Sequence, residues 1–306
     1  MDTPQLHAFV AVVDIGSFTR AAARLNLSQP TVTTRVKSLE QGLGVTLLER
    51  LPSGVRPTAA GRQLLPYARE IISLTGRARQ AIVAGGQPHG RVDVGTVESL
   101  TSYRLLPMVE YLYRRYPNVQ VALHAGAGPD AVAAVREGRL DCAFVVGSPE
   151  EHEGLETQVL CPEPMVLVSS PGHPVTGRGP VGGDVLRTTP IIRADTRAGY
   201  QLQFEQALGL LDGPDRPRVF DLDSIDAAKR SVALGIGLAF IPLVSVEREL
   251  ADGTLAVVDW VPPFDTCTQV VRRRTRTPNS ALDALVATAL DVAAEHLDDD
   301  RVLAAG

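Results

Sequence analysis

The stretch from Phe18 to Glu40 constrains the fold of this chain more than any other part of the sequence. It opens with a compact alanine-rich run, and Asn26-Leu27-Ser28 then form a turn whose serine suits the cap at the start of a helix. Pro30 falls in the first turn of the next helix, where its missing N–H costs least. Apolar residues recur beyond it at helical spacing and would pack on the first helix: Val32, Val36 and Leu39. The stretch therefore predicts two short helices joined by a tight turn.

The outward face of the second predicted helix carries amide, hydroxyl and cationic side chains. Such groups can contact base edges and phosphates, so this face suits a recognition helix in a DNA groove. A hairpin that turns at Pro52-Ser53-Gly54, with a cation on each arm, is a candidate wing. The candidate DNA-binding residues are Ser28, Gln29, Pro30, Thr31, Thr33, Thr34, Arg35, Lys37, Arg50 and Arg56. Paired amphipathic helices also occur in α-rich domains that bind no nucleic acid, and spacing alone leaves that alternative open.

Two further helices are predicted around this pair. An apolar stripe (Leu6, Phe9, Val10, Val13) indicates a preceding helix that completes a three-helix core. Thr58 suits the cap of a long helix that reaches Ala84, is loosened at Pro66 and ends at Gly85-Gly86-Gln87-Pro88. Its apolar stripe needs a partner, which is either a second copy of the helix or the rest of the same chain: Leu64, Leu65, Ala68, Ile71, Ile72, Thr75, Ala78 and Ile82.

From Arg91 the pattern changes to short strands that alternate with helices. A strand ends at a Ser/Thr-rich turn of sequence ESLTS, and helices and strands then alternate as far as the apolar run CAFVVG. This βαβαβ order predicts a parallel sheet with helices on both faces. The same order repeats from Met165 to Ile241 and predicts a second α/β lobe. Two lobes joined by crossing strands would hold a ligand where their strand ends face each other.

The predicted ligand contacts lie at strand ends that open helices. Hydroxyls, cations and helix N–H groups there suit a carboxylate or another anion. The candidate effector-binding residues are Ser99, Thr101, Ser102, Gly147, Arg193, Thr196 and Arg197. For each of them an ordinary helix-capping role is the alternative.

The charge of the chain is divided unevenly. Residues 1–90 hold ten Lys and Arg against five Asp and Glu, while the remainder holds twenty against thirty. A basic first third on an acidic body fits a DNA-binding module joined to a part with another task. The amino terminus lacks a basic start and an apolar signal core, and no apolar run has the length to span a bilayer, so a cytoplasmic protein without a membrane role is expected.

Motifs for enzymes, cofactors and metal sites are missing from the sequence. The six histidines have no metal-ligand spacing, and GxSxG, Walker and dinucleotide-binding patterns do not occur. We therefore expect neither an enzyme nor a cofactor. Cys142 and Cys267 lie in apolar runs where buried structural thiols are common, and a redox sensor built on Cys161 is the sharper alternative.

The chain resembles the LysR-type transcriptional regulators over nearly its whole length. The matching motifs are LHAFVAVVDIGSFTRAAARLNLSQPTVTTRVKSLEQGLGVTLLER, PTAAG, REGRLDCAFVVG, GHP and VALGIGLAFIPLVSVERELADGTL. The resemblance implies an α/β protein with an all-α winged helix-turn-helix in front (1–60), a long linker and dimerisation helix (61–88) and a two-lobed, periplasmic-binding-protein-like effector domain (89–306). Lobe I would cover about 89–162 and 266–306, and lobe II about 163–265.

The same resemblance implies a regulator that binds double-stranded promoter DNA as a homodimer or homotetramer. A small-molecule effector, anionic by the residues above, would bind between the lobes and modulate that binding. The antiparallel pairing of two linker helices would set the distance between recognition helices. Two alternatives stay open, a redox-responsive regulator that uses a cysteine and a solute-binding module without a DNA role. The wing departs from the family pattern, because its tip lacks further arginines and leaves Arg50 and Arg56 with most of the charge.

Overall fold

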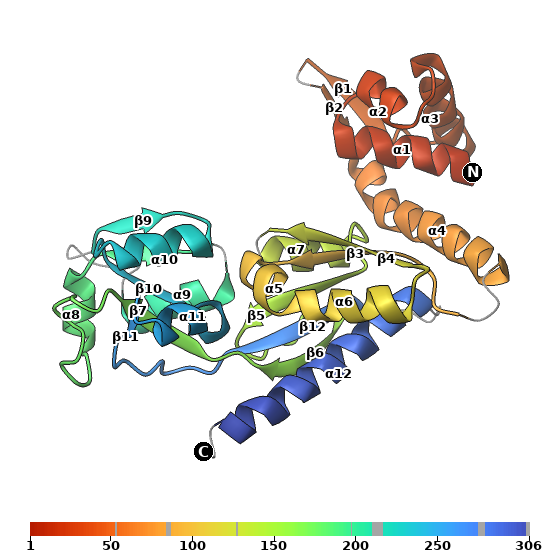
Figure 1. The fold of residues 1–306 in the computed structure, drawn as a ribbon. Coiled ribbons are helices and arrows are strands. Elements are labelled where there is room, and N and C mark those ends of the chain that lie inside the picture. The colour runs from red at the N-terminus through yellow and green to blue at the C-terminus, as the bar shows by residue number, and fades with distance from the viewer. Residues whose placement is uncertain are drawn as a thin grey trace. The chain divides into compact units, whose positions relative to one another are not determined.

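The fold is described from a computed structural model. It describes residues 1–52, 54–83, 87–126, 128–196, 198–209, 217–274 and 279–303. The chain divides into two compact units, Met1–Gly90 with Glu137–Arg139, and Arg91–Arg136 with Leu140–Gly306. Each unit is described by itself (Figure 1).

The first unit begins with the three predicted helices, α1 (Thr3–Ile15), α2 (Phe18–Arg24) and α3 (Gln29–Leu43). Local signals fix their starts, because the side chains of Asp2, Ser17 and Ser28 each accept a backbone N–H in the first turn of the helix that follows. One face of each helix is buried in a common core: Leu6, Phe9, Val12, Ala21, Val32, Val36 and Leu39. The predicted helix-turn-helix with a preceding helix is confirmed.

The predicted hairpin is also present. β1 (Leu48–Leu51) pairs antiparallel with β2 (Gly54–Pro57), and the expected turn residue Ser53 lies outside the described residues. The start of this wing is tied to α3, since Oε1 of Glu40 accepts the N–H groups of Leu47 (2.8 Å) and Leu48 (3.2 Å).

The linker helix α4 (Ala59–Val83) contains Pro66 in its interior. Thr58 caps it as predicted, because its hydroxyl accepts the N–H of Gly61 at 3.1 Å. The first part of the predicted apolar stripe packs on the core of the same unit: Leu64, Leu65, Ala68, Ile71 and Ile72. For this part the alternative in which the helix packs on its own chain is therefore correct. Residues 84–86, where the helix was expected to end, lie outside the described residues, as does the side chain of Ile82.

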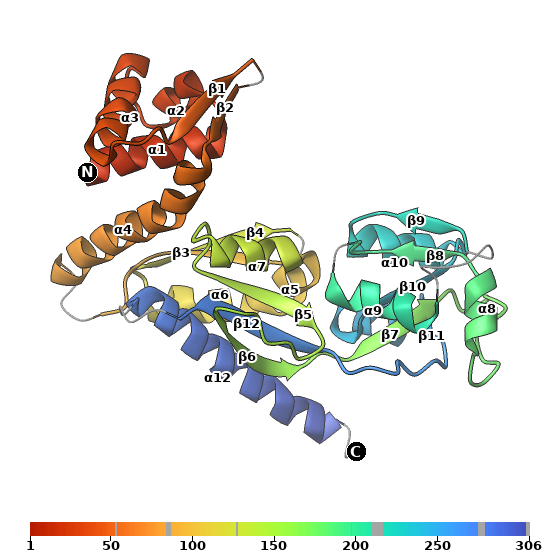
Figure 2. The ribbon, with the colours of Figure 1, turned by 180° about the vertical axis from the view of Figure 1, so that it is seen from behind.

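Lobe I of the second unit is a five-stranded sheet in the order β4-β3-β5-β12-β6. Its strands are β3 (Gly90–Thr96), β4 (Val119–Ala125), β5 (Cys142–Gly147), β6 (Leu155–Pro162) and β12 (Cys267–Arg273). Its helices are α5 (Glu98–Tyr103), α6 (Leu105–Arg115), α7 (Gly128–Arg136) and α12 (Ser280–Leu303). The final helix α12 lies alongside α6 and β6 in both views (Figures 1 and 2), so the end of the chain completes lobe I.

Lobe II is a second five-stranded sheet in the order β11-β7-β10-β8-β9. Its strands are β7 (Met165–Ser169), β8 (Ile191–Arg193), β9 (Val219–Asp221), β10 (Leu238–Pro242) and β11 (Ala256–Val257). Its helices are α8 (Gly183–Thr188), α9 (Gly199–Ala207), α10 (Ile225–Ala233), the 3-10 turn η1 (Leu243–Ser245) and α11 (Glu247–Ala251). One apolar cluster includes residues of both lobes, among them Phe144 of lobe I and Phe204 and Phe240 of lobe II.

Two expectations for this unit were wrong, and one strand was not predicted. The sheets are mixed rather than parallel, because β12 runs antiparallel to β5 and β6, and β7 runs antiparallel to β10. The ESLTS segment is the helix α5 rather than a turn. The strand β6, which pairs with β12 along its length, had no counterpart in the sequence-based prediction.

Among the described residues, no single helix is both long and apolar enough to span a bilayer. The helices α1 and α2 reach that standard only as a pair, with a bend of 119° between them. The buried faces of both helices belong to the core of the first unit.

Candidate functional site

The predicted recognition surface lies on α3. Ser28, Gln29, Pro30, Thr34 and Lys37 are exposed at its start and along its outer face, while Thr31, Thr33 and Arg35 are half-buried. Local hydrogen bonds orient part of this surface: the amide of Gln29 donates to the hydroxyl of Thr33 at 2.9 Å, and the hydroxyls of Ser28 and Thr31 lie 2.8 Å apart. The structure therefore gathers the predicted residues from Ser28 to Lys37 at the start and along the length of one helix.

Both cations of the wing are exposed, Arg50 on β1 and Arg56 on β2. The guanidinium of Arg50 lies 4.8 Å from the ring centre of Phe18, at the start of α2. A cation over a ring face is held by electrostatic attraction, which limits the positions that Arg50 samples. The wing thus presents two exposed arginines, and Phe18 of the helical core orients one of them, Arg50.

His7 of α1 is an exposed residue with Arg35 of α3 nearby. Burial, and then the nearby Arg35, lower the pKa of His7 below its ordinary value of 6.5. A neutral imidazole is therefore favoured beside Arg35 near neutral pH.

The described part of α4 also carries an exposed apolar row. Tyr67 is 65 % exposed and Leu74 is 40 % exposed. They are seven residues apart, so they lie on one face of the helix. This row is distinct from the stripe that packs on the core of the same unit. Nearer that core, Arg69 pairs with Asp14 of α1 at 2.5 Å.

The second unit contains a cavity of about 330 Å³ where the two lobes meet. Lobe I supplies the end of β5 at Gly147, the start of α7 at Gly128, and Gln269 of β12. Lobe II supplies Gly199 and Gln203 of α9. Figure 2 shows α9 beside the carboxyl end of β5, which is the edge where α/β proteins bind ligands.

Two glycines let the lobes approach closely at this cavity. A Cβ added to Gly199 would lie 3.1 Å from the carbonyl oxygen of Val146 and 3.7 Å from the Cα of Gly147. The first turn of α9 therefore rests on the backbone of β5, and no side chain caps that helix. The N–H groups at the start of an uncapped helix attract negatively charged groups.

The side chains of the cavity wall form a directed hydrogen-bond network. The N–H of Glu150 donates to Oε1 of Gln269 at 3.1 Å, and Nε2 of Gln269 donates to the carbonyl oxygen of Ser148 at 2.9 Å. The hydroxyl of Ser148 donates to the carbonyl oxygen of Asp265 at 3.2 Å and accepts Nε2 of Gln203 at 2.6 Å. Gln203 of lobe II is thus fixed to lobe I. Valines form much of the remaining wall, and the charged Arg136, Glu150 and His152 complete it.

Of the predicted effector residues that the structure describes, Gly147 alone is among those that line this cavity. Ser99 is 1 % exposed, Ser102 is exposed, and the hydroxyl of Thr101 donates to the carbonyl oxygen of Val97 at 3.1 Å. All three lie on α5. Gly147 and α5 both belong to lobe I, but the described residues that line the cavity of about 330 Å³ include none from α5.

The predicted residues of lobe II have partners within that lobe. Arg193 forms ion pairs with Glu205 (2.6 Å) and Asp221 (3.3 Å). The hydroxyl of Thr196 donates to a carboxylate oxygen of Asp223 at 2.6 Å. Arg197 lies outside the described residues. A direct contact of Arg193 or Thr196 with a ligand stays a prediction, and it would compete with these bonds.

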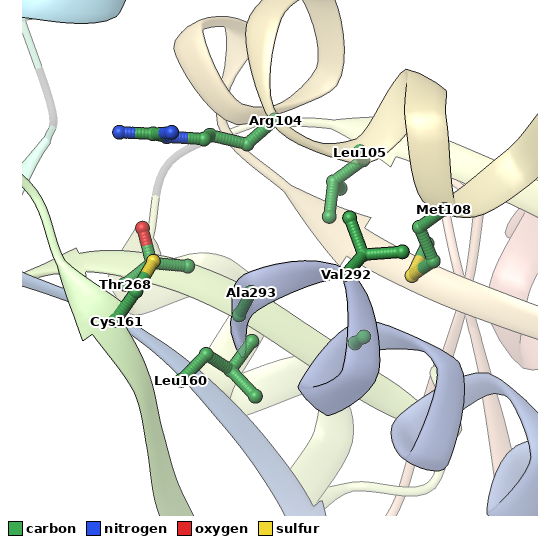
Figure 3. Close-up of a pocket in the computed structure, with 9 residues that line it drawn as sticks. Arg104, Leu105, Met108, Leu160, Cys161, Thr268, Val292 and Ala293 are labelled. Atoms are coloured by element: carbon green, nitrogen blue, oxygen red, sulfur yellow. The ribbon is translucent and has the colours of Figure 1, made fainter. Parts of the chain in front are cut away.

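A second, smaller cavity of about 40 Å³ lies within lobe I. Figure 3 shows Leu105 and Met108 of α6 facing Val292 of α12, with Cys161 and Thr268 on the opposite side. Cys161 is half-buried at this cavity. Burial, and then Cys161, raise the pKa of Cys267 to about 11, and burial raises the pKa of Cys142 as well. A raised thiol pKa lowers the thiolate fraction, so Cys142 and Cys267 have the character of structural thiols.

The described part of the chain contains no candidate metal site. Within it, no group of three or more His, Cys, Asp and Glu side chains is placed to hold an ion.

Sequence reasoning missed most of the cavity wall, because its residues come from four separated elements. One signal was available: Gln269 carries a buried amide inside the strand segment Cys267–Val271, whose other residues are apolar apart from Thr268. Gly128 and Gly199 gave another, since each opens a helix without a side chain that would cover the first N–H groups.

Comparison with known proteins bears on both units. Residues 3–62 match the family model described as bacterial regulatory helix-turn-helix protein, lysR family, and residues 85–294 match the LysR substrate binding domain. The HTH-type transcriptional regulator CbbR of Xanthobacter flavus is 30 % identical over 258 residues, which cover 83 % of this chain and 77 % of CbbR.

Solved structures show the same fold at lower identity. ArgP from Mycobacterium tuberculosis superimposes with a TM-score of 0.72 at 21 % identity, over 96 % of this chain and 97 % of that one. Full-length CbnR in complex with its target DNA superimposes with a TM-score of 0.61 at 23 % identity, over 95 % of this chain and all of that one.

Proposed function

Because the chain belongs to the LysR family of DNA-binding transcriptional regulators, with a helix-turn-helix domain and an effector-binding domain, we propose a division of labour within it. The outer face of α3 and the wing read promoter DNA. The cavity of about 330 Å³ between the lobes binds the small-molecule effector. The single observation that carries the second assignment is that one cavity is lined by the strand end of lobe I and by the first turn of α9 from lobe II.

The DNA-binding assignment is supported by side-chain chemistry. Gln29 and Thr34 offer an amide and a hydroxyl for base edges, and Lys37 offers a cation for a phosphate. Arg50 and Arg56 of the wing are exposed and suit backbone contacts. The CbnR structure contains that protein's target DNA, which supports the same use of this fold here. Such a role belongs in the cytoplasm, where bacterial DNA is found, and it requires no enzymatic activity.

We expect the regulator to act as a homo-oligomer. The exposed row of Tyr67 and Leu74 on α4 would otherwise leave two large apolar side chains in water. A second copy of the helix is the simplest partner, and pairing would fix the distance between two recognition helices. Two half-sites on promoter DNA could then be bound together.

The cavity favours a small anionic effector. The starts of α7 and α9 both line it, and helix N-termini stabilise negative charge by about 0.3–1 kcal/mol or more. Arg136 adds a cation at the wall. A ligand that contacts both lobes stabilises the arrangement in which it makes more contacts, and it can change DNA binding only by that difference in affinity.

The test uses a matched pair of variants on α9. Gln203 lines the cavity and bonds to Ser148, whereas Gln206 is exposed on the same helix. We expect a set of small mono- and dicarboxylates to contain compounds that raise the melting temperature of the second unit, since a ligand that binds only the folded state stabilises it.

Gln203→Leu should weaken that shift and the response of promoter binding to the same compound. Gln206→Leu should leave both unchanged. Equal responses in the two variants would place the effector outside this cavity. Uncharged compounds of similar size are screened beside the carboxylates, and a response confined to the uncharged compounds would refute the anionic class.

A further inference from the structure

The helix α5 reaches from lobe I to lobe II. Oε2 of Glu98, its first residue, accepts the N–H of Ile225 at 2.8 Å. Ile225 is the first residue of α10 in lobe II, where Ser224 already caps the N–H of Ala227. A carboxylate of one lobe thus binds the positive end of a helix of the other, and both its hydrogen bond and its charge are favourable there.

The last residue of α5 makes a second contact with the same helix. The ammonium of Lys229 lies 5.5 Å from the ring centre of Tyr103 and donates to its hydroxyl at 3.4 Å. Lys229 is 10 % exposed at its side chain and is held in place by Glu249 at 2.7 Å. Tyr103 also packs on the apolar core of lobe II. Ile225 and Lys229 are four residues apart, so α5 contacts a single face of α10.

The residue after α5 contacts the region where the chain crosses from lobe I to lobe II and later returns; these two connecting segments are called the crossovers. Arg104 forms an ion pair at 3.1 Å with Glu163, which lies between β6 and β7 and is 1 % exposed. Glu163 also accepts the hydroxyl of Thr268 at 2.8 Å, and its carbonyl oxygen accepts the hydroxyl of Thr266 at 2.6 Å. Thr266 ends the return crossover and Thr268 lies at the start of β12, so the two crossovers are bound to each other and to the end of α5.

We propose that α5 is a latch that fixes the angle between the lobes whether or not a ligand is bound. The contacts of Glu98 with Ile225 and of Tyr103 with Lys229 form this α5 latch, and Arg104 anchors it at the crossovers. Two chain crossovers alone would leave the lobes free to rotate as a hinge. Figures 1 and 2 both show α5 at the end of lobe I that faces lobe II. The latch holds the lobes on this side, and the bond from Gln203 to Ser148 holds them at the cavity.

Hydrogen–deuterium exchange of the full-length chain, without effector or DNA, tests the latch. Glu98→Ala removes a charge-assisted hydrogen bond, and exchange at residues 224–228 should rise roughly tenfold. If the latch sets the lobe angle, exchange should also rise at residues 147–150 and 199–203, where the lobes meet at the cavity. The matched control is Glu110→Ala, which removes a carboxylate of lobe I that pairs with Arg114 on its own helix. The control should leave all three segments unchanged.

A rise confined to residues 224–228 would reduce Glu98 to a helix cap and overturn the latch. Tyr103→Leu keeps the apolar contact but removes the ring and its hydroxyl, and the double variant with Glu98→Ala should exchange faster than either single variant. If the double variant exchanges no faster than Glu98→Ala alone, Tyr103 does not contribute to the latch, and the latch as proposed is refuted.

Glu98→Gln is the control for general unfolding, because its side chain keeps an oxygen that can accept the N–H of Ile225 and loses only the negative charge. The exchange rate of this variant should lie between those of the wild type and Glu98→Ala. Exchange equal to wild type would mean that the charge of Glu98 contributes nothing. No arm of the experiment involves an effector, so its failure would leave the proposed function untouched.

Discussion

Gly61, in the first turn of α4, is the position where one added methyl group should do the most damage to the DNA-binding unit. A Cβ there would lie 2.1 Å from the carbonyl oxygen of Leu47 and 3.1 Å from the Cβ of Pro57. Real Cβ contacts start at about 3.0 Å, so the helix and the wing would have to separate by about 0.9 Å. The obstacle is backbone at the start of the wing, and it cannot rotate away as a side chain could.

Gly61→Ala should therefore destabilise the unit by about 3 kcal/mol or more, at or beyond the upper end of typical overpacking costs. For a domain of this size that corresponds to a melting temperature lower by at least about 12 °C. Promoter affinity should fall as well, because the displaced residue Leu47 leads directly into β1. Differential scanning calorimetry and fluorescence anisotropy with labelled promoter DNA measure the two effects.

Gly76→Ala is the matched control on the same helix. No atom lies within 4 Å of a Cβ added to Gly76, so the substitution only replaces a poor helix former by a good one. It should stabilise the unit by about 0.5–1 kcal/mol. If Gly61→Ala melts at the temperature of Gly76→Ala and binds DNA equally well, the close packing of α4 on the wing is wrong.

Three further outcomes are expected in the first unit. Gln29→Ala should cost about 1–3 kcal/mol at the cognate promoter and little on random DNA in competition assays; equal losses would limit Gln29 to backbone positioning. Leu74→Asp should abolish dimers in sedimentation without lowering the melting temperature, whereas Ile71→Asp, which alters the half-buried stripe, should lower that temperature. The folded-state pKa of His7 is lowered, so the unfolded state binds the proton more readily. The free energy of unfolding should thus fall as the pH is lowered through about 6.5 toward the folded-state pKa. His7→Gln should remove that loss when the melting temperature is measured as a function of pH. If the melting temperature of His7→Gln depends on pH as it does in the wild type, His7 is not the source of the loss.

The first unit could be predicted in detail because its signals are local. Ser17 and Ser28 cap the helices that follow them, and both caps can be read within three residues of the sequence. The alternation of strands and helices likewise predicted two α/β lobes in the second unit.

The errors in the second unit have a common physical cause. The segment Glu98–Tyr103 is rich in hydroxyls that favour turns, yet it is helical where its two ends bind α10 of the other lobe. Tertiary contacts outweigh local propensity there. The strand β6 was missed for a similar reason, since it is an edge strand whose pairing with β12 joins residues more than one hundred positions apart.

The contrast between Arg193 and the cavity shows why residue type alone did not locate the proposed effector site. Arg193 is the kind of side chain that binds an anion, but Glu205 and Asp221 already neutralise it. A ligand that displaced them would leave the buried carboxylate of Glu205 without its cation, at a cost of several kcal/mol. The start of α9 has backbone N–H groups that no side chain caps, and Gly199 leaves them accessible beside Gly147. In the proposed function, an anion at the cavity would be bound mainly by backbone N–H groups. Its recognition would then depend on the close approach of two glycines, one from each lobe, and a change in lobe angle would directly change the proposed effector site.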